Sequence, residues 1–269
     1  MKRIRRSLLI LHPDAGFRER VRLAAGKEYK IDAYASWTEL RAAAREASPA
    51  ALVVVDPYAE RDGALGPSPG LRALIAEFPS VSTIAAMEVT PSRFDDLRTL
   101  GTWGVVQIIS LDHDDTPYAI AQRLRAARGR PLRALLEQTL PAEIPGRARA
   151  ILEAAVDIVA VGGEGKDLAR ALFLSRRTLL RWCMQAKLPP PRSLLAWMRI
   201  LLAAELLDDP GRDVLSVAMS CGYSSDSGLR RITQKFLGSS PTELRSEGAF
   251  STASAAFVEF LRTTRRKRK

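Results

Sequence analysis

Residues that build disulfide frameworks and metal centres are scarce in this sequence. Its 269 residues include two cysteines and two histidines. Cys183 and Cys221 do not amount to a disulfide framework, and we expect both as small buried apolar groups. With so few sulfur and imidazole ligands, we expect no metal site. No nucleophile stands near a base in a catalytic pattern, so we expect neither an enzyme nor a cofactor.

Long apolar runs are also lacking. The most apolar long stretch, 194–207, contains Arg199 and Glu205, which argues against a membrane span and a membrane partner. Near the start, the apolar run Leu8–Leu11 is too short for a signal peptide and favours a strand. We therefore expect a cytoplasmic protein.

Positive charge is what the sequence has in excess. The formal net charge is +11, and residues 131–269 carry +8 of it. Six Lys and Arg residues lie within the last eight positions. A basic excess in one half is typical of a nucleic-acid-binding domain, and a basic run binds polyanions without reading their sequence. The length suggests two domains.

Residues 166–245 predict two short helix pairs on either side of one longer helix, at 191–207. The first pair is 166–173 and 176–186, with Ser175 as N-cap; the second is 214–220 and a helix from about Ser225, with Gly222 in the turn. Short helices joined by a tight turn, with arginines on the outer side of the second, indicate helix-turn-helix units. We expect DNA to be contacted by Arg176, Arg177, Thr178, Leu180 and Arg181 in the first unit, and by Ser225, Asp226, Ser227, Arg230 and Arg231 in the second.

The runs LSRRTLLRW, WMRILLAAELL and VLSVAMSCGYSSDSGLRRITQKFLGSSPTELR resemble the DNA-binding domain of the AraC/XylS family. This resemblance implies a sequence-specific transcription regulator that binds double-stranded DNA. Thr233 and Gln234 stand where the family usually has Phe-Lys, and the usual glycine near Lys187 is absent. The strongest agreement is at Ala218, Gly222, Tyr223, Ser227, Leu229, Arg231, Phe236, Gly238, Pro241 and Arg245.

The amino-terminal half alternates short apolar runs with helical stretches. Five such units predict an α/β domain, a doubly wound five-stranded parallel sheet covered by helices on both faces. The all-α carboxy-terminal domain then holds both helix-turn-helix units. The expected strands are 8–11, 29–34, 51–55, 81–86 and 105–109, and the expected helices are 16–25, 37–47, 70–78, 92–100 and 117–128.

This α/β pattern resembles the receiver domain of response regulators, with a flavodoxin-like fold. Asp56 ends the third strand, where that family carries its phosphoacceptor. Aspartyl phosphorylation needs Mg²⁺ held by several carboxylates, and a cation beside the phosphoryl oxygens. The other expected positions hold residues that supply neither, so we interpret the domain as a pseudo-receiver, with Asp56 capping the next turn. Those positions are His12, Pro13 and Asp14 after the first strand, Ala86 or Met87 after the fourth, and Ile108 or Ile109 at the fifth.

We therefore expect a pseudo-receiver at 1–129, a linker at 130–146, an AraC-type DNA-binding domain at 147–246 and a basic tail at 247–269. The apolar residues Phe257, Val258, Phe260 and Leu261 allow part of this tail to pack back as a helix. The amino-terminal domain would dimerise or receive a protein or small-molecule input, without phosphorylation. Two alternatives stay open. The chain could be a response regulator phosphorylated on Asp56, or an interaction protein that titrates a signalling partner.

Overall fold

The computed structural model describes residues 6–49, 51–61, 65–114, 116–127 and 146–266. The chain divides into two compact units. The α/β unit holds the described residues up to 127 together with Asp209–Arg212, and the helical unit holds those from 146 on without these four. The expected linker at 130–146 lies outside the described residues, except for Gly146, where a helix begins.

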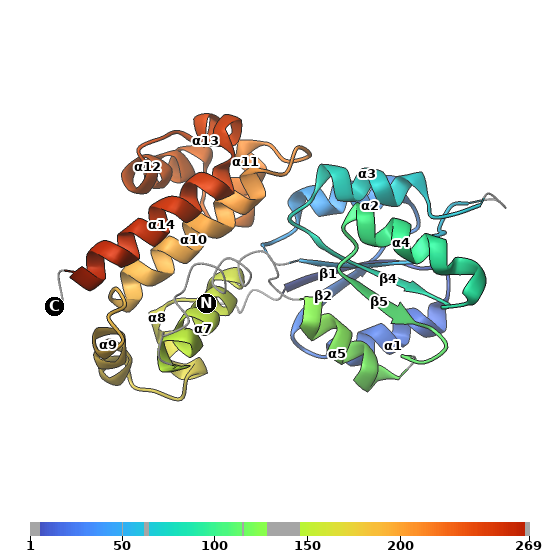
Figure 1. Ribbon diagram of the computed structural model, residues 1–269, viewed down its shortest axis with the longest axis horizontal. Helices are drawn as coiled ribbons and strands as arrows, with labels where there is room; N and C mark the ends of the chain where they lie inside the picture. Colours follow the sequence, from blue (N-terminus) through green and yellow to red (C-terminus); the bar gives the residue numbers. More distant parts are fainter. Residues whose placement is uncertain (1–5, 50, 62–64, 115, 128–145, 267–269) are drawn as a thin grey trace. The chain divides into compact units, whose positions relative to one another are not determined.

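Five parallel strands form the sheet of the α/β unit, in the order β2-β1-β3-β4-β5 (Figure 1). This order is the flavodoxin-like arrangement, and it confirms the expected fold class. The central strand β3 reads Leu-Val-Val-Val and is buried throughout, as a strand covered on both faces requires. The strands are β1 (Arg6–Leu11), β2 (Tyr29–Ala33), β3 (Leu52–Val55), β4 (Ser82–Met87) and β5 (Gln107–Ser110).

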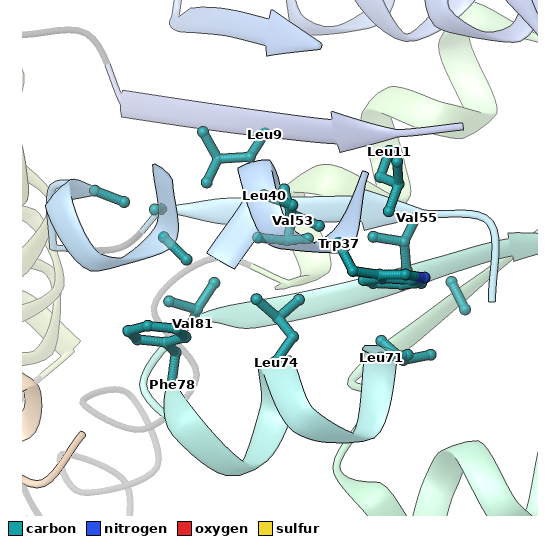
Figure 2. Close-up of a cluster of buried hydrophobic side chains, with 14 of the residues drawn as sticks. Leu9, Leu11, Trp37, Leu40, Val53, Val55, Leu71, Leu74, Phe78 and Val81 are labelled. Atoms are coloured by element: carbon teal, nitrogen blue, oxygen red, sulfur yellow. The ribbon is translucent and has the colours of Figure 1, made fainter. Parts of the chain in front are cut away.

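Helices cover both faces of this sheet. On one face α2, α3 and α4 bury a cluster that includes Trp37, Leu74 and Phe78 (Figure 2). On the other face α1 and α5 pack Phe17 and Leu124 against the alternate side chains of the strands. The elements are α1 (Ala15–Ala25), α2 (Trp37–Glu46), α3 (Pro69–Glu77), a single 3₁₀ turn η1 (Pro91–Arg93), α4 (Phe94–Trp103) and α5 (Pro117–Ala127).

The helical unit is built around α10, most of which is buried. Its Trp197 ring contacts the ring of Phe236 edge-on, at 5.2 Å between centroids. None of the helices in the described part of the chain is long and apolar enough to cross a membrane. The helices are α7 (Gly146–Ala160), α8 (Gly165–Ala171), α9 (Arg176–Gln185), α10 (Pro191–Leu207), α11 (Val214–Ser220), α12 (Asp226–Leu237), α13 (Pro241–Glu247) and α14 (Ala249–Arg266).

Helix α14 covers 249–266, most of the range expected as a basic tail, and is longer than the stretch 257–261 that could pack back as a helix. Ala253, Phe257 and Leu261 recur every four residues and are buried, so they form one apolar stripe. The rings of Phe257 and Phe260 lie 5.6 and 5.2 Å from the ring of Trp197. The two helices α10 and α14 lie side by side in Figure 1. Burial of the apolar stripe against α10 therefore stabilises residues 249–266 as a helix.

The two cysteines differ in their surroundings. Cys183 is buried on the inner side of α9, as expected. Cys221 is only half-buried, because it forms the C-cap of α11 at the start of the helix-turn-helix turn. The expectation that both thiols are buried is therefore wrong for Cys221. Within the described residues no three His, Cys, Asp or Glu side chains are grouped as metal ligands.

Candidate nucleic-acid interface

The two helix-turn-helix units share one turn geometry. In the first, the N–H of Leu174 donates to the carbonyl of Ala169 at 2.8 Å. In the second, the N–H of Tyr223 donates to the carbonyl of Ala218 at 2.9 Å. The residue before each donor has a left-handed backbone, which satisfies the last carbonyls of the preceding helix. Each turn therefore redirects the chain into its second helix in the same way.

Serine caps start both second helices. The Oγ of Ser175 accepts a hydrogen bond from the N–H of Thr178 at 3.1 Å. The Oγ of Ser225 accepts one from the N–H of Gly228 at 3.3 Å. An N-cap satisfies one of the free N–H groups of the first turn, so both helices have fixed starting points. The outward side chains of α9 and α12 are thereby positioned from their first residues on.

The outer face of α9 joins basic and apolar side chains. Arg177, Leu180 and Arg181 are exposed and lie on one stripe at i, i+3 and i+4. Arg176 is exposed beside them. Arginine donates to the O6 and N7 of guanine, and an apolar side chain such as Leu180, 42% exposed, can contact a thymine methyl. This stripe is therefore suited to reading a mixed sequence in the major groove.

The outer face of α12 is more polar. Ser227, Arg230 and Arg231 are exposed and share one side of the helix. The hydroxyl of Ser227 can donate or accept at base edges, and the two guanidinium groups suit guanine or phosphate. The two units therefore present different chemistry at their outer faces.

Three of the expected DNA contacts hold their helix in place. Ser225 is the cap of α12, and Asp226 accepts from the N–H of Ser227 at 2.7 Å. The hydroxyl of Thr178 lies 2.9 Å from that of the cap Ser175. All three are half-buried at the helix starts, whereas the other seven expected residues are exposed.

The residues that carry the AraC/XylS resemblance mainly build the scaffold. Leu229 is fully buried, and burial raises the pKa of the Tyr223 hydroxyl to about 12. Arg245 donates to the carbonyl of Leu207 at 2.8 Å, at the C-terminal end of α10. Pro241 begins α13, and Gly238 ends α12 with a left-handed backbone. These contacts explain why such residue types recur at these spacings.

Two exposed apolar residues of the first unit were not predicted from the sequence. Met184 is 57% exposed and continues the stripe of Leu180 along α9, at i+4. Phe173 is 97% exposed in the turn and has a φ of 56°. Extending the outer stripe by one turn would have found Met184. No sequence signal indicates a left-handed phenylalanine.

Asp56 lies at the carboxyl end of β3, half-buried. Its N–H donates to the carbonyl of Leu11 at 2.8 Å, and its Oδ1 accepts from the N–H of Tyr58 at 2.8 Å. The carboxylate thus caps the turn after the strand. In its neighbourhood, Asp14 caps α1 by accepting from the N–H of Gly16 at 2.7 Å. Both carboxylates therefore have structural roles.

The other residues at the carboxyl ends of the strands also differ from those of a receiver phosphorylation site. His12 is buried, and its Nδ1 accepts from the N–H of Asp14 at 3.2 Å. Met87, at the end of β4, is apolar and buried. β5 carries Ile108 and Ile109 where the resemblance leads to a lysine. The chain therefore offers neither the acidic pair nor the lysine at these positions.

Comparison with known protein families supports the class that the geometry defines. The fold joins a flavodoxin-like α/β unit to an all-helical unit with two helix-turn-helix pairs. Residues 168–247 match the family model described as "Helix-turn-helix domain". The match supports an AraC-type DNA-binding transcription regulator. No curated protein and no solved structure matched the chain.

Proposed function

We propose that this chain is a sequence-specific transcription regulator that contacts two segments of one DNA duplex, through α9 and α12. The observation that carries the proposal is the pair of capped helices with exposed arginines on their outer faces. Their connector α10 has 17 residues, which corresponds to about 25 Å of helix. With the bodies of the two units added, this length favours contacts about one DNA turn, or ~34 Å, apart.

Selection of binding sites from random duplex DNA, followed by footprinting, tests the proposal. Arg181→Ala should cost about 1–3 kcal/mol of binding free energy and relax base preference at one position. Arg149→Ala, an exposed arginine on α7, is the matched control and should keep the preference. Protection of a single groove segment per chain would contradict the two-segment arrangement.

We further propose that the α/β unit is a pseudo-receiver that acts without phosphorylation, as a dimerisation or ligand-input module. Support comes from the turn-capping role of Asp56 and from the apolar side chains where a receiver has its serine or threonine and its lysine. A ligand without differential interaction shifts no equilibrium. Acetyl phosphate with Mg²⁺ should therefore leave the intact mass and the DNA affinity unchanged, and Asp56→Asn should bind DNA like the parent. A gain of one phosphoryl group with tighter binding would restore the phosphorylated alternative.

A further inference from the structure

Four residues between α10 and α11, Asp209–Arg212, belong to the α/β unit. The side chains of Asp209 and Arg212 are fully buried and form an ion pair, with Nε and Oδ2 2.9 Å apart. Fully buried charges are rare unless they are paired and hydrogen-bonded. The short segment is therefore anchored, unlike an ordinary surface loop.

The α/β unit supplies matching partners for both charges. Asp209 accepts hydrogen bonds from the N–H of Ser80 at 2.8 Å and from its hydroxyl at 2.5 Å. Arg212 donates to the carbonyls of Arg45 and Ala47, at 2.7 and 3.0 Å. These carbonyls lie at the C-terminal end of α2, where the helix dipole favours a cation. Burial raises the pKa of the Asp209 carboxyl, and the bonds from Ser80 and Arg212 oppose that rise.

Gly211 fits this surface through its backbone. Its N–H donates to the carbonyl of Glu77 at 2.9 Å, and its carbonyl accepts from Nε of Arg45 at 3.0 Å. A Cβ at position 211 would lie 2.5 Å from the ring of Phe78, closer than real Cβ contacts. Only glycine can therefore occupy the position without moving this core ring.

The residues that hold the segment, 45–47 and 77–80, are here called the anchoring surface, and they lie at the opposite end of the strands from Asp56. Residues 45–47 precede β3, and residues 77–80 precede β4, so the surface lies at the amino ends of these strands. Asp56 follows the carboxyl end of β3. Figure 2 shows Phe78 and Val81 at one end of the buried cluster, away from Trp37 and Leu71 at the other. The carboxyl ends of the strands, where a receiver domain carries its phosphorylation site, are therefore separate from the anchoring surface.

The residue on each side of the segment caps the start of a helix, α11 on one side and α14 on the other. Asp213 is the N-cap of α11 and accepts from the N–H of Ser216 at 2.7 Å. Asp208 accepts from the N–H groups of Ala249 and Phe250, at 2.7 and 2.9 Å, at the start of α14. An anchored segment restrains both caps, because each is its direct neighbour in the chain.

We propose that residues 45–47 and 77–80 form a docking site for the segment 209–212, and that docking orders the start of the second helix-turn-helix unit. The α/β unit then governs reading by α12, while α9 is free of this restraint. The part that concerns DNA rests on the proposed function.

Gly211→Ala in the full chain tests the proposal, because the added methyl group meets Phe78. Gly165→Ala is the matched control, since outside its chain neighbours and the backbone of its own helix nothing lies within 4 Å of the added Cβ. Hydrogen exchange should become faster in 45–47, 77–80 and α11–α12 of the first variant, with α8–α9 unchanged. DNA affinity should fall at least fivefold, at the low end of the ~5–150-fold range of typical couplings. Footprint protection should be lost at one of the two segments.

Three outcomes would overturn the proposal: exchange equal to that of the control, faster exchange that includes α8–α9 equally, or unchanged DNA binding despite a released segment. If Gly211→Ala fails to fold, Ser80→Ala replaces it. That variant removes one hydrogen bond to Asp209 and should give the same pattern to a smaller degree. If the parent chain binds no DNA, the proposed function fails, while the exchange comparison still decides whether docking orders α11.

Discussion

Phe173 stands in the first helix-turn-helix turn where Gly222 stands in the second. Their φ angles are 56° and 80°, both left-handed. A residue with a Cβ incurs ~1–2 kcal/mol in this conformation, whereas glycine does not. With its ring exposed to solvent, Phe173 gains almost no burial in return. The strain therefore persists without a compensating contact among the described residues.

We predict that Phe173→Gly stabilises the helical unit. Relief of the ~1–2 kcal/mol of strain, less the ~0.4–1 kcal/mol lost to the greater freedom of unfolded glycine, leaves a gain of up to about 1.6 kcal/mol. Urea unfolding followed by circular dichroism measures it. Gly222→Ala is the mirror control and should destabilise. A lower unfolding midpoint for Phe173→Gly would show that the ring contributes to stability.

Buried His12 makes the α/β unit sensitive to acid. Burial lowers the pKa of the imidazole from its ordinary 6.5, while Asp56 and Asp14 act to raise it and Arg18 to lower it. The Nδ1 lone pair also accepts from the N–H of Asp14, which a protonated ring could not do. The unfolded chain therefore binds the proton more readily than the folded one.

The sign of the pH dependence follows from this depressed pKa. The contribution of neutral His12 to stability is full above 6.5 and is lost as the pH falls through the folded-state pKa. His12→Asn keeps an acceptor for the N–H of Asp14 and does not titrate. It should flatten the fall in unfolding midpoint between about pH 7 and 5 that linkage predicts for the parent. An equally steep fall in both proteins would contradict this role.

At the scale of elements, α14 acts as a structural partner of α10. A chain ended after Gly248 loses the burial of Phe257 and Leu261 and uncovers Trp197. The loss should exceed the ~3–5 kcal/mol of a single Phe→Ala replacement in a core. Thermal unfolding measures it, and a chain ended after residue 266 is the control. Equal stability of the two truncated chains would show that α14 does not stabilise the helical unit.

Most elements were predictable because their signals are local. The ranges 191–207 and 214–220 agree with α10 and α11, since proline and aspartate mark their starts and an apolar face runs through each. The second half of α14 was indicated by its apolar residues at 257–261, but the first half was not, because small polar residues surround its few apolar ones. The anchored segment was missed for a different reason: Asp-Pro-Gly-Arg is typical of a turn, and its partners lie more than 120 residues away in sequence.

At the scale of the whole molecule, the charge excess predicts how binding depends on salt. Five basic residues occupy 265–269. Replacing all five with glutamine should weaken binding to every sequence alike and flatten the slope of log K against log salt by up to ~4.5. Titrations at several salt concentrations, on a selected and a scrambled duplex, measure this. If the replacement changed the ratio of the affinities for the two duplexes, residues 265–269 would take part in base reading.

The six residues from Asp208 to Asp213 hold the starts of two helices at a set separation along the chain, because both end residues cap a helix. Surface loops usually tolerate insertions, and epitope tags or fluorescent reporters are commonly placed in them. Here an added residue would pull Asp208 from α14, Asp213 from α11, or the ion pair from its hydrogen-bond partners in the α/β unit. The length of this loop is therefore as constrained as that of a core strand, and a probe of this protein belongs elsewhere.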